Sequence, residues 1–284
     1  MKKAFTAVAV ALALAASAFS TAQAGPAEDL TAFQGHFKEA FKDVPFADFK
    51  DGAYALDPNL KEQWQTMEEF PPYEPDVDAG KAMWEKPLKN GKTYAECMGD
   101  IKTLRTKYPM YDAAKDTIVT LEGALNACKT DGDGEGFVDK EGKPLLNKGK
   151  IAQLMAYIAM ENRGSKIEVA TPEGKAVAWY DKGKNFYYAK RGQLNMSCAD
   201  CHTNNAGKMI RADLLSPAVG HVTHWPTYRS ADGEITTLHN RFMGCNTMVR
   251  ANNFKAQSDE YKALEYFLTY MSNGLEWNGP GSRK

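Results

Sequence analysis

The sequence has almost no excess charge of either sign, no basic stripe and no long apolar run after residue 24. Its 35 Lys and Arg residues and 36 Asp and Glu residues give a formal net charge of −1. Nucleic-acid binding normally requires clustered positive charge, and a membrane span requires roughly 20 apolar residues in succession. We therefore predict a protein that binds no nucleic acid and has no membrane span.

The apolar run at the N-terminus is typical of a secretory signal. Lys2 and Lys3 precede an alanine-rich run that ends near Phe19, and the tripeptide AQA ending at Ala24 is a small-x-small cleavage site. The run has no polar face, which disfavours a buried helix. We predict that residues 1–24 are a signal peptide and that the mature chain is exported to the periplasm. Cleavage leaves 33 basic and 36 acidic residues, a net charge of −3.

Cysteine is scarce, and its number is odd. The five cysteines are Cys97, Cys128, Cys198, Cys201 and Cys245. An oxidising compartment permits disulfides, but an odd number leaves at least one cysteine with another task. The roughly 260 residues of the mature chain suffice for one large domain or two small ones, at about 100–200 residues each.

The segment from Cys198 to His202 has the sequence CADCH and matches C-x-x-C-H, the attachment motif of c-type haem. Two thiols add to the haem vinyl groups, and the adjacent histidine reaches the iron. A zinc site would need a second ligand pair, and the chain has no second C-x-x-C. A thioredoxin-type redox pair would leave His202 unexplained. We predict one covalently bound haem c.

The second axial ligand of such a haem is not determined by the motif. A cytochrome c haem has either a second protein ligand or an open position. The candidates downstream of the motif are His221, His224, His239, Met209, Met243, Met248 and Cys245. Methionine is the usual choice in an electron carrier, and composition does not choose among these residues.

An internal repeat divides the chain into two halves. The segment YPMY at 108–111 ends 17 positions before Cys128, and WPTY at 225–228 ends 17 positions before Cys245. A Thr-Leu pair begins eight positions before each of these cysteines. Self-similarity of this kind indicates two copies of one unit.

Each half also ends in an amphipathic helix that a glycine terminates. Residues 151–164 and 258–274 place apolar side chains at helical spacing, and Ser258 is a typical N-cap. Residues 129–150 are rich in glycine and charge and are predicted to form a loop. Their DGDGEG run lacks the closing glutamate of an EF-hand and is not expected to bind calcium.

Overlaying the copies predicts that only the second holds a haem. A glycine lies six positions before Cys97 and again before Cys198, which places Asp100 and Ile101 over the second cysteine and the histidine of the motif. Cys128 lies at the position of Cys245. With no haem between them, Cys97 and Cys128 can approach to the Cα separation of a disulfide, roughly 4.4–6.8 Å. We predict that they pair.

At this level of detail the chain resembles the SoxA subunit family of the SoxAX cytochromes, which oxidise thiosulfate. The stretches that carry the resemblance are GQLNMSCADCH at 192–202, WPTYR at 225–229, RFMGCN at 241–246, LEYFLTYMSNGLEWNGPGSR at 264–283 and MAYIAMENRGSKIEV at 155–169. The resemblance implies a mainly α fold of two cytochrome c-like domains, which we place at 25–168 and 169–284. Some family members have a haem in each domain; this chain departs from them in the first copy and is similar to the monohaem type.

The resemblance also implies roles for the residues of the second copy. Cys198 and Cys201 would hold the haem, His202 would be the proximal ligand, and Cys245 would be both the distal ligand and the reactive sulfur. Arg241, four positions before Cys245, would lie beside it on a helix and bind the sulfonate oxygens of thiosulfate. The implied reaction joins thiosulfate to a cysteine of the carrier protein SoxYZ. Two electrons pass through the haem to SoxX, and Cys245 carries sulfur as a persulfide.

Two other functions are compatible with the same motif. A simple monohaem electron-transfer cytochrome would have Met209, Met243 or Met248 on the iron. A haem-bearing structural subunit would leave the chemistry to its partner and would make Cys245 dispensable. A thiolate ligand lowers the haem potential whereas methionine raises it, so the distal ligand distinguishes the first alternative.

Overall fold

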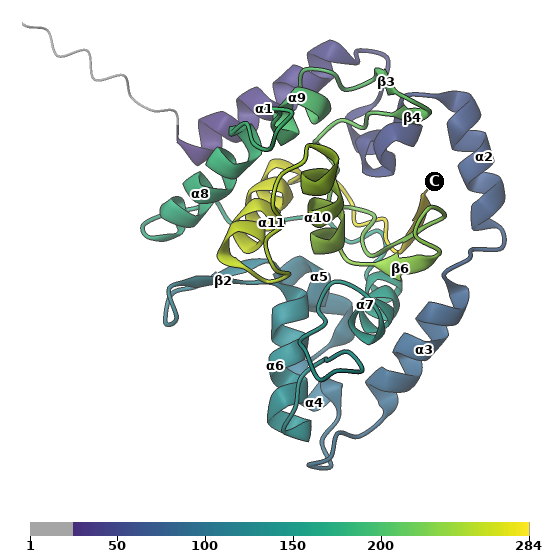
Figure 1. The fold of residues 1–284 in the computed structure, drawn as a ribbon, viewed down its shortest axis with the longest axis vertical. Coiled ribbons are helices and arrows are strands. Elements are labelled where there is room, and N and C mark those ends of the chain that lie inside the picture. The colour runs from purple at the N-terminus through teal and green to yellow at the C-terminus, as the bar shows by residue number, and fades with distance from the viewer. Residues whose placement is uncertain (1–24, 284) are drawn as a thin grey trace, which may run out of the picture.

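Helices dominate residues 25–283, the part of the chain that the computed structural model describes (Figure 1). The predicted signal peptide, residues 1–24, lies outside the described residues. No helix within 25–283 is both long and apolar enough to cross a membrane. In chain order the elements are α1 (Pro26–Ala40), η1 (Phe46–Ala55), α2 (Pro58–Glu68), α3 (Glu74–Glu85), α4 (Tyr94–Met98), η2 (Ile101–Thr103), α5 (Leu104–Lys107), β1 (Met110–Asp112), β2 (Thr117–Val119), α6 (Leu121–Asp133), α7 (Lys150–Glu161), α8 (Ala176–Tyr188), α9 (Cys198–His202), β3 (Met209–Ile210), β4 (Asp213–Leu214), β5 (Thr227–Arg229), β6 (Glu234–Thr236), α10 (Leu238–Met248), α11 (Asp259–Met271) and β7 (Gly281–Arg283).

The two halves repeat one order of elements, as the sequence predicts. Helices α3 and α4, hairpin β1–β2 and helices α6 and α7 form the first half; α8, α9, hairpin β5–β6, α10 and α11 form the second. Figure 1 shows them one below the other. Thr120 and Thr237 are the N-caps of α6 and α10. The Thr-Leu pairs of the repeat are therefore equivalent helix starts.

In each half the first and last helices cross at a glycine. A Cβ on Gly183 of α8 would lie 2.1 Å from the carbonyl oxygen of Ala263 in α11. A Cβ on Gly80 of α3 would lie 2.1 Å from the carbonyl oxygen of Gln153 in α7. Both helix pairs therefore pack backbone against backbone, which only glycine permits. The tetrapeptides DAGK at 78–81 and DKGK at 181–184 mark these equivalent positions in the sequence.

The terminal helix of each half lies where its pattern predicts. Helix α7 buries Ile151, Leu154, Met155 and Ile158. Helix α11 buries Tyr261, Leu264, Phe267, Leu268 and Met271. The Ser258 side chain accepts a hydrogen bond from the Tyr261 amide and caps α11. The loop predicted from residue 129 begins later, because α6 continues to Asp133 and ends at Gly134, whose φ of 77° is left-handed.

Two short helices, α4 and α9, begin with the same capping box. In α4 the Thr93 side chain accepts from the Glu96 amide, and the Glu96 carboxylate accepts from the Thr93 amide. In α9 Ser197 and Asp200 make the same reciprocal pair. The capping box satisfies two helix-end amides and fixes where a helix starts, so it gives the register of the repeat at these helices.

That register corrects the sequence overlay by three positions. Counted from the caps, Cys97 matches Cys201 and not Cys198, while Tyr94 and Met98 stand at the places of Cys198 and His202. The overlay was wrong because the loop between the shared glycine and the cap is three residues longer in the second half. The first half still lacks the first cysteine and the histidine of the motif.

A disulfide joins Cys97 of α4 to Cys128 of α6, the pair that the repeat predicts. The Cα atoms are 6.0 Å apart. Cys128 belongs to the apolar core of the first half, with Trp84, Leu104 and Leu125. The disulfide thus links two helices at the apolar core of the first half.

The N-terminal residues pack on the second half. Phe33 and Phe37 of α1 and Phe49 of η1 lie in the same core as Phe267 of α11. The Tyr180 hydroxyl of α8 donates to an Asp29 oxygen at 2.7 Å. Residues that the sequence assigns to the first domain, 25–168, therefore cover the second, and the division after residue 168 stays a prediction.

We expect the loss of the disulfide to destabilise the first half and leave the second unaffected. Replacing Cys97 and Cys128 with alanine releases a loop of 31-residue separation, which costs about 3–4 kcal/mol on the chain-entropy model. The melting temperature should fall and the visible spectrum of the holoprotein should not change. Recovery of both residues as free thiols, in non-reducing peptide maps of exported protein, would contradict the pairing.

Gly183→Ala should destabilise the protein by about 1–3 kcal/mol, because the added methyl group forces α8 away from α11. Gly80→Ala should act in the same way on the first half. Gly35→Ala is the matched control: it also lies in a helix, and its Cβ would meet no atom within 4 Å. Chemical denaturation measures all three, and equal stability of Gly183→Ala and Gly35→Ala would refute the close crossing.

Candidate functional site

One pocket of the second half collects every residue predicted for the site. Helix α9 supplies Cys198, Cys201 and His202, and helix α10 supplies Arg241 and Cys245. None of the three cysteines is in a disulfide. Short α9 is held at its start by the Ser197–Asp200 capping box, so both thiols and the imidazole project from a single turn of helix.

A backbone carbonyl fixes the orientation of His202. Its Nδ1 lies 2.9 Å from the carbonyl oxygen of Ser216. A carbonyl only accepts hydrogen bonds, so Nδ1 carries the hydrogen and Nε2 keeps its lone pair. Histidines that ligate a metal normally have this arrangement, in which the second nitrogen donates to a fixed acceptor. His202 is therefore prepared to act as a ligand through Nε2.

His221 is held behind His202. The two rings are edge-to-face with centroids 4.2 Å apart. The Ser216 hydroxyl and His221 Nε2 are 3.0 Å apart, so Ser216 contacts one histidine through its backbone and the other through its side chain. Burial, and then the nearby His202 and Arg241, hold the pKa of His221 well below its usual value. His221 is consequently neutral, and its Nε2 already has the Ser216 hydroxyl as a hydrogen-bond partner.

Cys245 faces His202 across the pocket and has an unusually acidic thiol. Burial acts to raise its pKa, but the positive charge of Arg241 and a hydrogen bond with His202 outweigh burial and lower the pKa to about 7. Cys245 as a whole residue is half-buried. Cys198 differs, because burial and the neighbouring Cys245 raise its pKa to about 12. Reactivity follows the thiolate, and Cys245 has the most acidic thiol among the three free cysteines of the pocket.

Arg241 is a free cation in the pocket. It lies four positions before Cys245 on α10, so both side chains point from the same face of the helix. Within residues 25–283 its guanidinium takes part in no hydrogen bond or ion pair. A planar guanidinium with unoccupied donors beside a thiolate suits an oxyanion such as a sulfonate.

The positions of the side chains shorten the list of candidates for the second axial ligand. His239 does not line the pocket and is bound elsewhere. Met209 and Met243 do not line it either, whereas Met248 does but is 52% exposed. His221 lines the pocket, but its Nε2 contacts the Ser216 hydroxyl. His224 also lines the pocket. Cys245 is the candidate that faces His202.

The walls of the pocket fit a flat, mostly apolar group with polar edges. The apolar residues of the wall are Phe186, Tyr187, Trp225, Leu238, Phe242, Leu264 and Leu268. Two buried nitrogen atoms in the wall, Nη1 of Arg191 and Nδ1 of His224, have no hydrogen-bond partner in the described chain. Haem c presents an apolar macrocycle and two carboxylates, and its covalent attachment uses two thiols and one imidazole. The residues present therefore fit it.

A bare metal ion fits less well. Among the described residues no group of three or more His, Cys, Asp or Glu side chains could hold an ion. The zinc interpretation of the motif needs four such ligands, and the pocket does not supply them.

Several pocket residues have no recognisable signal in the sequence. Ser216 acts through its backbone carbonyl, which any residue type could supply. Arg191 stacks on the Phe186 ring at 3.5 Å, outside the motif and the repeat. His224 directly precedes the WPTY segment, and the sequence indicates it only as a candidate iron ligand. Their proximity depends on folding of the 203–225 segment over the motif.

Comparison with known proteins gives a consistent family. Residues 79–167 and 182–277 match the SoxA/TsdA cytochrome c domain family. The chain is 49% identical, over 92% of its length and 91% of the relative, to the L-cysteine S-thiosulfotransferase subunit SoxA of Allochromatium vinosum. It is 50% identical to the SoxA subunit of Chlorobaculum tepidum, over 90% of this chain and 87% of the relative.

A solved structure agrees with the sequence relatives. The crystal structure of SoxXA from P. pantotrophus superposes with a TM-score of 0.68 at 33% identity, covering 78% of this chain and 84% of that one. The two segments that match the SoxA/TsdA cytochrome c domain family correspond to the two halves of the repeat. By sequence and by fold, this chain belongs to the SoxA family of cytochrome c-domain proteins.

Proposed function

We propose that this chain is the SoxA subunit of an L-cysteine S-thiosulfotransferase that joins thiosulfate to a cysteine thiol of the carrier protein SoxYZ. The observation that carries the proposal is the pair on α10: an unpaired guanidinium, Arg241, beside the acidic thiol of Cys245, opposite His202 of the C-x-x-C-H motif. The named SoxA relatives support the activity, and the SoxXA structure supports SoxX as the partner subunit.

The reaction balances with two electrons and one proton released. The outer sulfur of thiosulfate and the carrier sulfur form a new S–S bond, the carrier thiol loses its proton, and the pair is oxidised by two electrons. Arg241 would hold the sulfonate oxygens and place the outer sulfur toward Cys245. Formation of a bond between the Cys245 sulfur and that outer sulfur would release the two electrons. The carrier thiolate would then attack the outer sulfur, forming the new S–S bond while the bond to Cys245 breaks and its thiolate is restored.

A single haem c is the cofactor in this proposal. Cys198 and Cys201 would hold it covalently, and His202 and Cys245 would be its two protein ligands. When bound, the haem supplies one-electron transfer to the SoxX subunit. The first half lacks an equivalent of Cys198 and of His202, so we assign no haem to residues 25–168. Export to the periplasm follows from the signal sequence at residues 1–24.

We expect one haem per mature chain after expression with cytochrome c maturation. The C-x-x-C-H motif occurs once, and the first half has Tyr94 and Met98 at the equivalent positions. Intact-mass measurement should give a chain that begins near Gly25 plus one covalent haem. Cys198→Ala with Cys201→Ala should remove the covalent attachment. Two haems on one chain would exclude the monohaem assignment.

Arg241→Ala should leave the haem spectrum nearly intact and reduce thiosulfate conjugation greatly. Loss of a charge-assisted contact costs about 1.5–3 kcal/mol, or roughly ten- to a hundredfold in rate. Arg241→Lys should recover little, because an ammonium does not reproduce the planar fork. Lys140→Ala, an exposed cation of the first half, is the control and should be unaffected.

Cys245→Ala separates the proposed enzyme from the two alternatives. We expect it to change the low-spin haem spectrum and to abolish conjugation. A simple electron-transfer cytochrome with methionine on the iron would keep its spectrum and show no substrate-specific defect in Arg241→Ala. A structural subunit would conjugate normally without the thiol. Full turnover by folded, haem-loaded Cys245→Ala, assayed with SoxX and the carrier, would end the catalytic assignment.

A further inference from the structure

Four titratable side chains meet in the interior, where the first half contacts the second. Arg105 comes from α5, Glu122 from α6, His239 from α10 and Glu265 from α11, and their exposed fractions are 8%, 3%, 0% and 8%. Glu122 and His239 are equivalent positions of the repeat, each two residues after a threonine N-cap. We call these four residues the interdomain cluster. Such groups are rarely buried without a function or a strict pairing.

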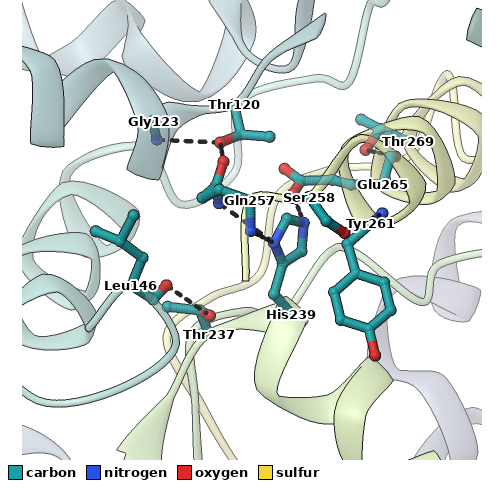
Figure 2. A network of polar contacts seen from close by, with 10 residues as sticks. All are labelled: Thr120, Gly123, Leu146, Thr237, His239, Gln257, Ser258, Tyr261, Glu265 and Thr269. Atoms are coloured by element: carbon teal, nitrogen blue, oxygen red, sulfur yellow. Dashed lines mark hydrogen bonds and ion pairs between the residues drawn. The ribbon is translucent and has the colours of Figure 1, made fainter. Parts of the chain in front are cut away.

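The protonation state of His239 follows from its neighbours (Figure 2). The backbone amide of Gln257 donates to His239 Nδ1 at 3.0 Å. An amide only donates, so Nδ1 holds a lone pair and the hydrogen of the neutral ring is on Nε2. That nitrogen lies 3.0 Å from Glu265 Oε2. The two atoms are in close contact, but neither has a hydrogen-bond partner among the described residues.

Arg105 supplies the positive charge of the cluster. Its guanidinium stacks on the Trp277 ring, 3.7 Å from the centroid. Burial lowers its pKa to about 10, partly opposed by Glu122 and Glu265, so it stays charged at neutral pH. Arg105 is therefore the cation that acts on both carboxyl groups of the cluster, Glu122 and Glu265.

Glu122 is the group that is poised to change protonation. Its Oε2 is buried and has no hydrogen-bond partner within residues 25–283. Burial, followed by the negative charge of Glu265, raises its pKa to about 7, with His239 and Arg105 opposing. Arg105, His239 and Glu265 are the charged or titratable groups that act on it from the packed helices. The carboxyl therefore has both an uncompensated oxygen and no fixed charge state.

The interdomain cluster lies directly behind the wall of the pocket. The His239 ring packs against Phe242, with centroids 5.7 Å apart, and against Tyr261 at 5.5 Å. The Asn246 side chain donates to the Tyr261 hydroxyl at 2.9 Å. Phe242 and Asn246 both line the pocket, three positions before and one position after Cys245 on α10. In this apolar setting a charge in the pocket acts on the cluster with little screening.

We propose that the haem-less half supplies Glu122 as a redox-linked proton site, which takes up a proton from solvent when the pocket gains an electron and releases it when the electron leaves. The inference rests on the proposed function, which places a one-electron carrier in the pocket. The electron comes from oxidation of thiosulfate and the carrier thiol, and each electron is matched by at most one proton on the Glu122 carboxylate. An added negative charge behind Phe242 favours the neutral carboxyl over the carboxylate.

The test is a potentiometric titration of the haem-loaded chain with its SoxX partner, followed by absorbance between pH 5.5 and 9. The midpoint potential of this haem should fall as pH rises through neutrality. A tenfold difference in proton affinity between the two redox states corresponds to a total change of about 59 mV. Glu122→Gln should make the potential independent of pH over this range. Glu141→Gln, an exposed carboxyl of the first half, should keep the wild-type slope.

A second readout does not depend on the folding of a variant. Infrared difference spectra of the wild-type holoprotein should show a protonated-carboxyl band that appears on reduction, and Glu122→Gln should lack it. A pH-independent wild-type potential, or a wild-type slope retained in Glu122→Gln, would overturn the inference. If the chain conjugates thiosulfate but its midpoint potential does not depend on pH, only the proposed role of Glu122 is overturned. If the chain attaches no haem, the proposed function itself is overturned.

Discussion

The close crossing of the first and last helices in each half is the constraint on which the rest of the structure depends. At Gly80 and at Gly183 the two backbones approach until no side chain fits between them. Helices held this close fix the space that the intervening segments can fill. In the second half that space is the pocket, with α9 on one side and α10 on the other. The position of Cys245 opposite His202 is a consequence of this packing.

The two halves share one arrangement of helices, but their equivalent cysteines differ in covalent bonding. In the first half the cysteine of α4 bonds directly to the cysteine of α6. In the second half the equivalent pair, Cys201 and Cys245, remains unbonded on the two sides of the pocket. A disulfide needs the two chains close together, whereas a haem needs them apart. The first half, which lacks one motif cysteine and the histidine, thus has a covalent link between helices at the place where the second half has its pocket.

Much of this arrangement is predictable from the sequence, because the internal repeat is visible in the spacing between the cysteines and the segments that precede them. The helices α7 and α11, the disulfide pair and the residues of the pocket lie where the spacing indicates. The register of α4 against α9 was predicted wrongly, since it depends on a loop length and not on a shared glycine. The packing of α1 on the second half, and the contact of His202 with Ser216, depend on tertiary contacts that no local pattern encodes.

The interdomain cluster is harder to explain by stability than by function. Buried ion pairs give little net stability, and apolar residues of the same volume often serve as well or better. The cluster buries two carboxyl groups, Glu122 and Glu265, with one cation, Arg105, and each of its four residues has a buried polar atom without a hydrogen-bond partner among the described residues. A first half that served only as a scaffold would have no need of these groups. The proposed change of charge at Glu122 would give the buried carboxyl a function, and would couple the first half electrostatically to the pocket of the second.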